Sequence, residues 1–187
     1  MQGERWFYRS DDEWNAFVER LKLTACPHCR KAGNLIRHGV LTGFDDANPP
    51  RRTLRARRIF CSNRHRRPGC GRTVSVWIAH KIRRVSLGTR TLLHFLRRVA
   101  TGKLMDANRN THASFSDRTL RRIVTRFDLA QSRIRTGLCS RCPPPTGPPD
   151  TGPRPILAEV LAHLLAAFPH TDCPIAAYQQ ATGTFIL

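Results

Sequence analysis

Acidic side chains are scarce in this chain of 187 residues, and long apolar runs are missing altogether. Only 13 Asp and Glu stand against 32 Lys and Arg, which leaves a formal charge of +19. This excess exceeds what solubility needs and indicates a polyanionic partner. No apolar stretch approaches the ~20 residues that span a bilayer, and residues 1–12 are too polar for a signal peptide. We therefore expect a cytoplasmic protein that does not bind membranes.

Signatures of catalysis are also missing. Asp106, Asp117 and Asp128 are the only acids in the basic part of the chain, and their even spacing gives no sign of convergence on divalent ions. There is no His-x-His pair and no glycine-rich phosphate loop. Tyr8 and Tyr178, the two tyrosines, lie outside any basic setting that would suit a recombinase nucleophile. We predict that the protein is not an enzyme.

The positive charge is concentrated in the middle of the chain. Residues 1–50 carry seven basic and seven acidic side chains, residues 51–141 carry 24 and three, and residues 142–187 carry one and three. Most of the central excess is arginine, whose planar fork binds phosphate oxygens or a guanine edge with two hydrogen bonds. A solvated basic face is the alternative, but ordinary surfaces mix both signs. The distribution favours nucleic-acid binding.

Seven cysteines in a reducing compartment suggest metal ligation more than disulfides. Cys26-Pro27-His28-Cys29 has the spacing of one half of a tetrahedral thiolate site. The predicted ligands of one structural zinc ion are Cys26, Cys29, Cys61 and Cys70.

The second half of this site has an unusual spacing, with eight residues between Cys61 and Cys70 where two are usual. We expect the intervening residues to bulge out as a loop, and Gly71 to supply the positive φ that follows a zinc thiolate. His65 competes with Cys70 as the fourth ligand, and His28 is a more distant candidate.

Several motifs resemble the zinc-ribbon DNA-binding modules of bacterial transposases and mobile-element accessory proteins. They are the Cys-Pro-x-Cys, a strand with Arg37-His38-Gly39, a basic strand ending in Arg58-Ile59-Phe60-Cys61, and the run Cys70-Gly71-Arg72-Thr73-Val74-Ser75-Val76. The resemblance covers residues 26–138 and implies a ribbon followed by a helix-turn-helix. The long cysteine loop departs from the pattern, and no transposase catalytic domain follows.

Periodicity and capping signals predict an α+β fold. A short strand at residues 5–9 and a helix starting at Ser10 precede strand-like runs at 35–41, 54–60 and 72–78. Helices are expected at 89–100, 103–112, 117–136, 156–168 and 174–182. The predicted segments are a strand/helix brace at 1–25, a β-rich zinc ribbon at 26–80, a tri-helical helix-turn-helix unit at 86–138, a Pro-rich linker at 143–155 and a C-terminal helical tail at 156–187.

The helix predicted at 117–136 has an arginine-rich outer face. Its inner positions are Leu120, Ile123, Val124 and Phe127, which leaves Arg118, Arg121 and Arg122 free to reach base edges in a major groove. The predicted nucleic-acid contacts are Arg51, Arg52, Arg55, Arg57, Arg64, Arg66, Arg67, Arg118, Arg121, Arg122, Arg126 and Arg133.

We therefore expect a duplex-DNA-binding protein of the nucleoid, either a site-recognising accessory factor of a mobile element or a transcription regulator. The alternative is an RNA-binding structural component of a ribonucleoprotein. RNA recognition usually stacks bases on exposed aromatic rings. The few aromatic residues of the basic region, such as Phe60, Trp77 and Phe95, read as core, and this favours DNA.

The C-terminal part carries two further predictions. A possible second zinc site consists of Cys139, Cys142, His170 and Cys173, the alternative being buried or idle thiols. The helix at 156–168 is apolar nearly all round and must be buried on several sides. Its own core or a partner could bury it, and we expect docking or self-association through Leu157, Leu161, Leu164 and Leu165.

Overall fold

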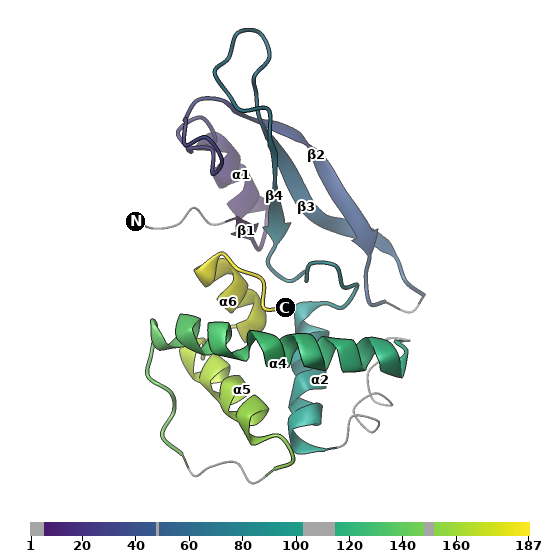
Figure 1. Cartoon of the computed structure of the whole chain (residues 1–187). Helices are drawn as coiled ribbons and strands as arrows, with labels where there is room; N and C mark the ends of the chain where they lie inside the picture. The colour runs from purple at the N-terminus through teal and green to yellow at the C-terminus, as the bar shows by residue number, and fades with distance from the viewer. Residues whose placement is uncertain (1–5, 48, 103–114, 148–151) are drawn as a thin grey trace. The chain divides into compact units, whose positions relative to one another are not determined.

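The computed structural model describes residues 6–47, 49–102, 115–147 and 152–187 (Figure 1). The chain divides into two compact units, one of residues 1–44 and 52–79 and the other of residues 45–51 and 80–187. The predicted brace and ribbon thus belong to one unit, and the central helices share the other with the C-terminal tail. No described helix combines the length and the apolar character needed to cross a bilayer.

The first unit contains a four-stranded mixed sheet and one helix. The elements are β1 (Phe7–Tyr8), α1 (Asp11–Glu19), β2 (Leu35–Phe44), β3 (Arg52–Cys61) and β4 (Thr73–Ile78). In the strand order β1-β4-β3-β2, β1 runs parallel to β4 and the other neighbours are antiparallel. The hairpin of β2 and β3 is longer than the sequence predicted, because the ladder continues through Thr42↔Leu54, Gly43↔Thr53 and Phe44↔Arg52.

Helix α1 begins as its sequence predicted. The Ser10 side chain accepts a hydrogen bond from the Glu13 backbone amide (3.2 Å), and the Glu13 carboxylate accepts one from the Arg9 amide (2.8 Å). The helix buries Trp14 in a core with Leu35 and Ile59 of the sheet. Cys26 and Cys61 lie in the same core, fully buried. The predicted metal ligands are therefore part of the packing that holds the first unit together.

The second unit contains the helices α2 (Thr89–Thr101), α4 (Asp117–Cys139), α5 (Pro155–Ala167) and α6 (Pro174–Thr182). Helix α4 begins at Ser116, whose side chain accepts from the Thr119 amide (3.3 Å). Helix α5 packs against α2, α4 and α6, and α6 also contacts α2. The helix predicted at 103–112 lies outside the described residues, so the helix-turn-helix stays a prediction.

Helix α5 is a core helix of its own unit. Leu157, Leu161 and Leu164 are 2%, 3% and 0% exposed. The chain's own α2, α4 and α6 pack on this helix, whereas we expected the stripe to dock on a partner or a second copy. Burial inside the unit accounts for the apolar character that motivated that expectation. Leu165 is only half-buried, and Ile156 at the start of the helix is exposed.

Candidate metal centre and basic surfaces

The four predicted zinc ligands meet in the first unit. The Sγ atoms of Cys26, Cys29, Cys61 and Cys70 all lie within 4.8 Å of one another. The Cys26–Cys70 and Cys29–Cys61 sulfur pairs are each 3.7 Å apart. A tetrahedral zinc ion with Zn–S bonds of about 2.3 Å requires sulfur–sulfur edges of about 3.8 Å. The cluster can therefore hold one metal ion, and both its donor set and its dimensions fit zinc.

Two tight turns present these thiols. In the first, the Arg30 amide donates to the Cys26 carbonyl (2.8 Å) and the Cys26 amide to the Lys31 carbonyl (3.0 Å). Arg30 adopts the left-handed conformation at φ 62°. The equivalent position of the second turn is Gly71 at φ 72°, as its place after Cys70 predicted.

The long segment between Cys61 and Cys70 closes at its base. The Gly71 amide donates to the Cys61 carbonyl (2.9 Å), and the Cys70 amide donates to the Cys61 sulfur (3.3 Å). Gly69 passes so close to Ser62 that a Cβ there would overlap the Ser62 carbonyl oxygen. This contact brings Cys61 and Cys70 together despite the insertion, and so confirms the bulged loop.

Cys70, not a histidine, completes the cluster. His65 lies exposed in the loop in a left-handed conformation (φ 52°). His28 is exposed in the first turn, where its Nδ1 is 3.5 Å from a guanidinium nitrogen of Arg72.

The thiols of the cluster differ in acidity. Burial raises the pKa of the Cys61 thiol to about 12, even though the Cys70 amide points at its sulfur. The Lys31 backbone amide lowers the pKa of Cys29 to about 7. Four neighbouring thiolates, two of them buried, would be strongly disfavoured without a compensating cation. A divalent ion supplies that charge, and its binding displaces the thiol protons.

The possible second zinc site is not assembled. Among the described residues, the only candidate metal-binding group is the one in the first unit. Cys139 is exposed and Cys173 is buried. The Cys142 carbonyl instead accepts a hydrogen bond from Nε2 of the buried His163 (3.0 Å), which ties α5 to the end of α4. We therefore keep a single metal site.

The nucleic-acid contacts predicted between residues 51 and 67 fall into two groups. Arg55 is 7% exposed and donates to the Phe44 carbonyl (2.9 Å). Arg57 pairs with Asp11, donates to the Tyr8 hydroxyl (3.2 Å) and stacks 5.2 Å from the Trp14 ring centroid. These two arginines are engaged inside the first unit. The exposed ones are Arg51, Arg52, Arg64, Arg66 and Arg67.

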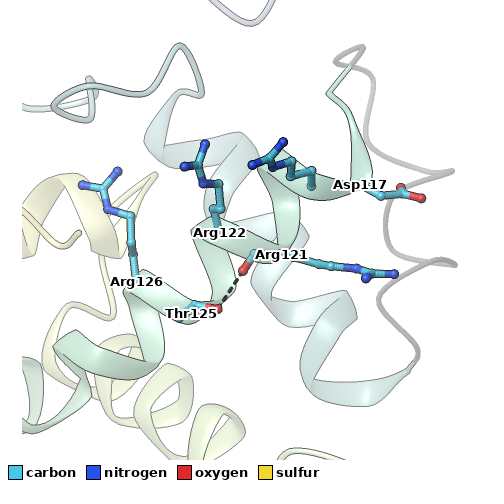
Figure 2. Close-up of a pocket in the computed structure, with 6 residues that line it drawn as sticks. Asp117, Arg121, Arg122, Thr125 and Arg126 are labelled. Atoms are coloured by element: carbon cyan, nitrogen blue, oxygen red, sulfur yellow. Dashed lines mark hydrogen bonds between the residues drawn. The ribbon is translucent and has the colours of Figure 1, made fainter.

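Helix α4 presents the arginines predicted for base reading. Arg118, Arg121 and Arg122 are exposed and Arg126 is half-exposed. Together with Asp117 and Thr125 they line an open hollow of about 530 Å³ on the helix surface, and Figure 2 shows Arg122 and Arg126 extending to the same side. Within the described part of the chain, no ion pair engages these four guanidinium groups. Arg133, farther along α4, is exposed and donates to the Ile186 carbonyl (3.4 Å).

One group of functional candidates was missed from the sequence. Phe60, which we expected in the core, is half-exposed, and its ring centroid lies 5.3 Å from that of the exposed His38. The Arg64 guanidinium lies over the same ring at 5.5 Å. Strand alternation between the buried Ile59 and Cys61 was the signal that could have found this orientation.

Comparisons with protein families, with curated proteins and with solved structures gave no match.

Proposed function

We propose that this protein binds duplex DNA, with zinc as a structural ion of the first unit and the arginine face of α4 as the main reading surface. The observation that carries the proposal is the row of arginines on α4, which form no ion pair with any residue that the structure describes. Arg118, Arg122 and Arg126 recur every four residues, so they follow one side of the helix over about 12 Å. The major groove of B-DNA, ~12 Å wide, admits an α-helix, so arginines along one side of α4 can reach base edges in it together.

The structural role of zinc follows from its ligand count. Four cysteine ligands leave no open position at which water or substrate could be activated. The ion would instead fix the turns from which Arg64, Arg66 and Arg67 extend. These exposed arginines suit contacts with phosphates. Such contacts position a protein on the duplex without carrying sequence information.

The biological role that we favour is site recognition, as an accessory factor of a mobile element or as a transcription regulator. Arginine pairs bidentately with the O6 and N7 acceptors of guanine, so the α4 face suits guanine-containing sites. An RNA-binding component of a ribonucleoprotein is the competing role, and the half-exposed Phe60 ring favours it, because RNA recognition usually stacks bases on exposed aromatic rings. Competition between duplex DNA and structured RNA for the zinc-loaded protein separates the two, and stronger competition by the RNA would overturn our preference.

The direct test is a salt titration of α4 variants on a selected duplex site and on a scrambled duplex. Arg121→Ala and Arg122→Ala should each cost ~1–3 kcal/mol on the selected site and much less on the scrambled one. Arg66→Ala should weaken both equally and make the salt slope shallower by ~1.

Arg20→Ala is the matched control, since it removes the same charge from an exposed position just after α1, in the part of the chain without net charge. Its affinity should stay near that of the unmodified protein. Equal losses on both duplexes for the α4 variants would make α4 a general phosphate clamp and would contradict site reading.

A further inference from the structure

A small group of rings and guanidinium groups lies on the face of the first unit's sheet opposite the metal cluster. Ile59 and Cys61 of β3 point into the core, and alternation along the strand turns Phe60 to the other face. The His38 ring lies 5.3 Å from the Phe60 ring at an interplanar angle of 33°, and the Arg64 guanidinium lies 5.5 Å from it. We call His38, Phe60 and Arg64 the stacking cluster.

A β-bulge positions the His38 ring. Arg37 is opposite Ile59 and Gly39 is opposite Arg58, so β2 contains one extra residue at this point. Gly39 adopts φ 142°, in the region that favours glycine. Bulges commonly re-aim a side chain beside a functional site. Here the bulge keeps an exposed imidazole next to an aromatic ring on the neighbouring strand.

The backbone that follows the metal ligand Cys61 positions Arg64. The Arg64 amide lies 3.4 Å from the Ser62 hydroxyl, and the Ser62 amide donates to the Asn34 carbonyl (2.8 Å). Ser62 directly follows the ligand Cys61 and is buried. The base of the loop that carries Arg64, Arg66 and Arg67 is therefore connected to both the sheet and the metal cluster.

The chain segment that contributes Phe60 and Arg64 carries charge of one sign. No Asp or Glu occurs between residues 47 and 105 of the sequence. Arg58 lies two positions before Phe60 on the same face of β3, and the exposed Arg66 and Arg67 follow Arg64 in the loop. A ligand of this surface should therefore combine a π face for Phe60 with negative charge for the arginines.

We propose that the stacking cluster binds an unpaired base of single-stranded DNA, with Arg58, Arg66 and Arg67 on the adjoining phosphates. The proposal rests on the proposed nucleic-acid-binding function and adds a single-stranded ligand to it. Every base offers a π face, so such a platform tolerates any sequence, and arginine contributes a cation–π interaction. A duplex does not satisfy the cluster, because its base faces are already covered by neighbouring base pairs.

The test uses the zinc-loaded full chain and a fluorescent oligo-dT of about 15 nucleotides, a length that single-strand-binding modules cover. Phe60→Leu keeps an apolar side chain and removes the ring, and it should weaken oligo-dT binding roughly 5- to 150-fold. The matched control is Phe44→Leu, which removes the exposed ring at the far end of β2 and should leave the affinity unchanged. A 2-aminopurine base in the oligonucleotide reports stacking through its fluorescence, and Phe60→Leu should abolish that signal.

Unchanged oligo-dT affinity of a zinc-loaded Phe60→Leu protein would overturn the proposal. If that variant loses zinc or its native tryptophan emission, His38→Ala at an exposed position replaces it, and unchanged affinity would again contradict the platform. Tighter binding of oligo-U, weakened equally by Phe60→Leu, would overturn the assignment to DNA. Duplex binding is tested separately through Arg121→Ala, so either proposal can fail without the other.

Discussion

Removal of the metal should unfold the first unit and leave the helices of the second unit folded. Cys61 is the most informative ligand to change, because it is fully buried at the end of β3 and belongs to the core with Trp14 and Leu35. A Cys61→Ser variant, or treatment of the unmodified protein with a strong chelator, should produce the same state. Both would remove the ion that we propose joins β3 to the turn at Cys26–Cys29.

The free energy that zinc contributes to folding decides whether its removal loosens the first unit or unfolds it. Structural zinc contributes roughly 10–16 kcal/mol to the folding of small zinc domains, whereas a whole domain is usually stable by only ~5–15 kcal/mol. Without the ion, the core also keeps cysteine thiols whose positions suit a tetrahedral metal cluster. The first unit should therefore lose its fold cooperatively when zinc is removed.

The distribution of aromatic residues provides the assay. All three tryptophans, Trp6, Trp14 and Trp77, belong to the first unit, and Trp14 is only 2% exposed. Their emission should shift to longer wavelength as zinc is removed. Most of the helical circular dichroism should remain, since four of the five described helices belong to the second unit.

A change at a cysteine outside the cluster serves as the control for Cys61→Ser. Cys139→Ser changes an exposed cysteine of the helical unit and should leave the zinc content and the tryptophan emission unchanged. A Cys61→Ser protein that keeps stoichiometric zinc and native emission would refute the metal assignment. Simultaneous loss of the helical signal would show that the second unit depends on the first for its stability.

Two further changes test the packing. Gly69→Ala should destabilise the first unit by about 1–3 kcal/mol and weaken zinc binding, because its Cβ would overlap the backbone of Ser62; chelator competition and thermal unfolding measure both effects. Leu161→Asp, which places a charge in the core of the second unit, should cost roughly 4 kcal/mol or more in thermal unfolding, whereas Ile156→Asp at a position that is 54% exposed should cost little. A stable Leu161→Asp protein whose mass in light scattering has fallen from that of an oligomer would instead identify an interface between copies.

Local features of this protein could be predicted from short stretches of its sequence. Ser10 and Ser116 begin helices because their side chains satisfy free amides within the next turn. Gly71 takes the left-handed conformation that its place after a zinc-ligand cysteine demanded. The metal ligands were also predictable, since the Cys26–Cys29 spacing defines one half of a tetrahedral site and chemistry requires a second half.

Packing between distant segments selects which of the predicted side chains remain available for binding. Arg55 and Arg57 look like any other arginine of the basic segment, but Phe44 and Asp11 engage them from elsewhere in the first unit. Whether Cys142 meets Cys173 and whether Leu161 meets a partner likewise depend on segments far away along the chain. Periodicity and spacing encode local geometry within a few residues, whereas the partner of a side chain is chosen by packing between remote segments, and this choice leaves little trace in a single sequence.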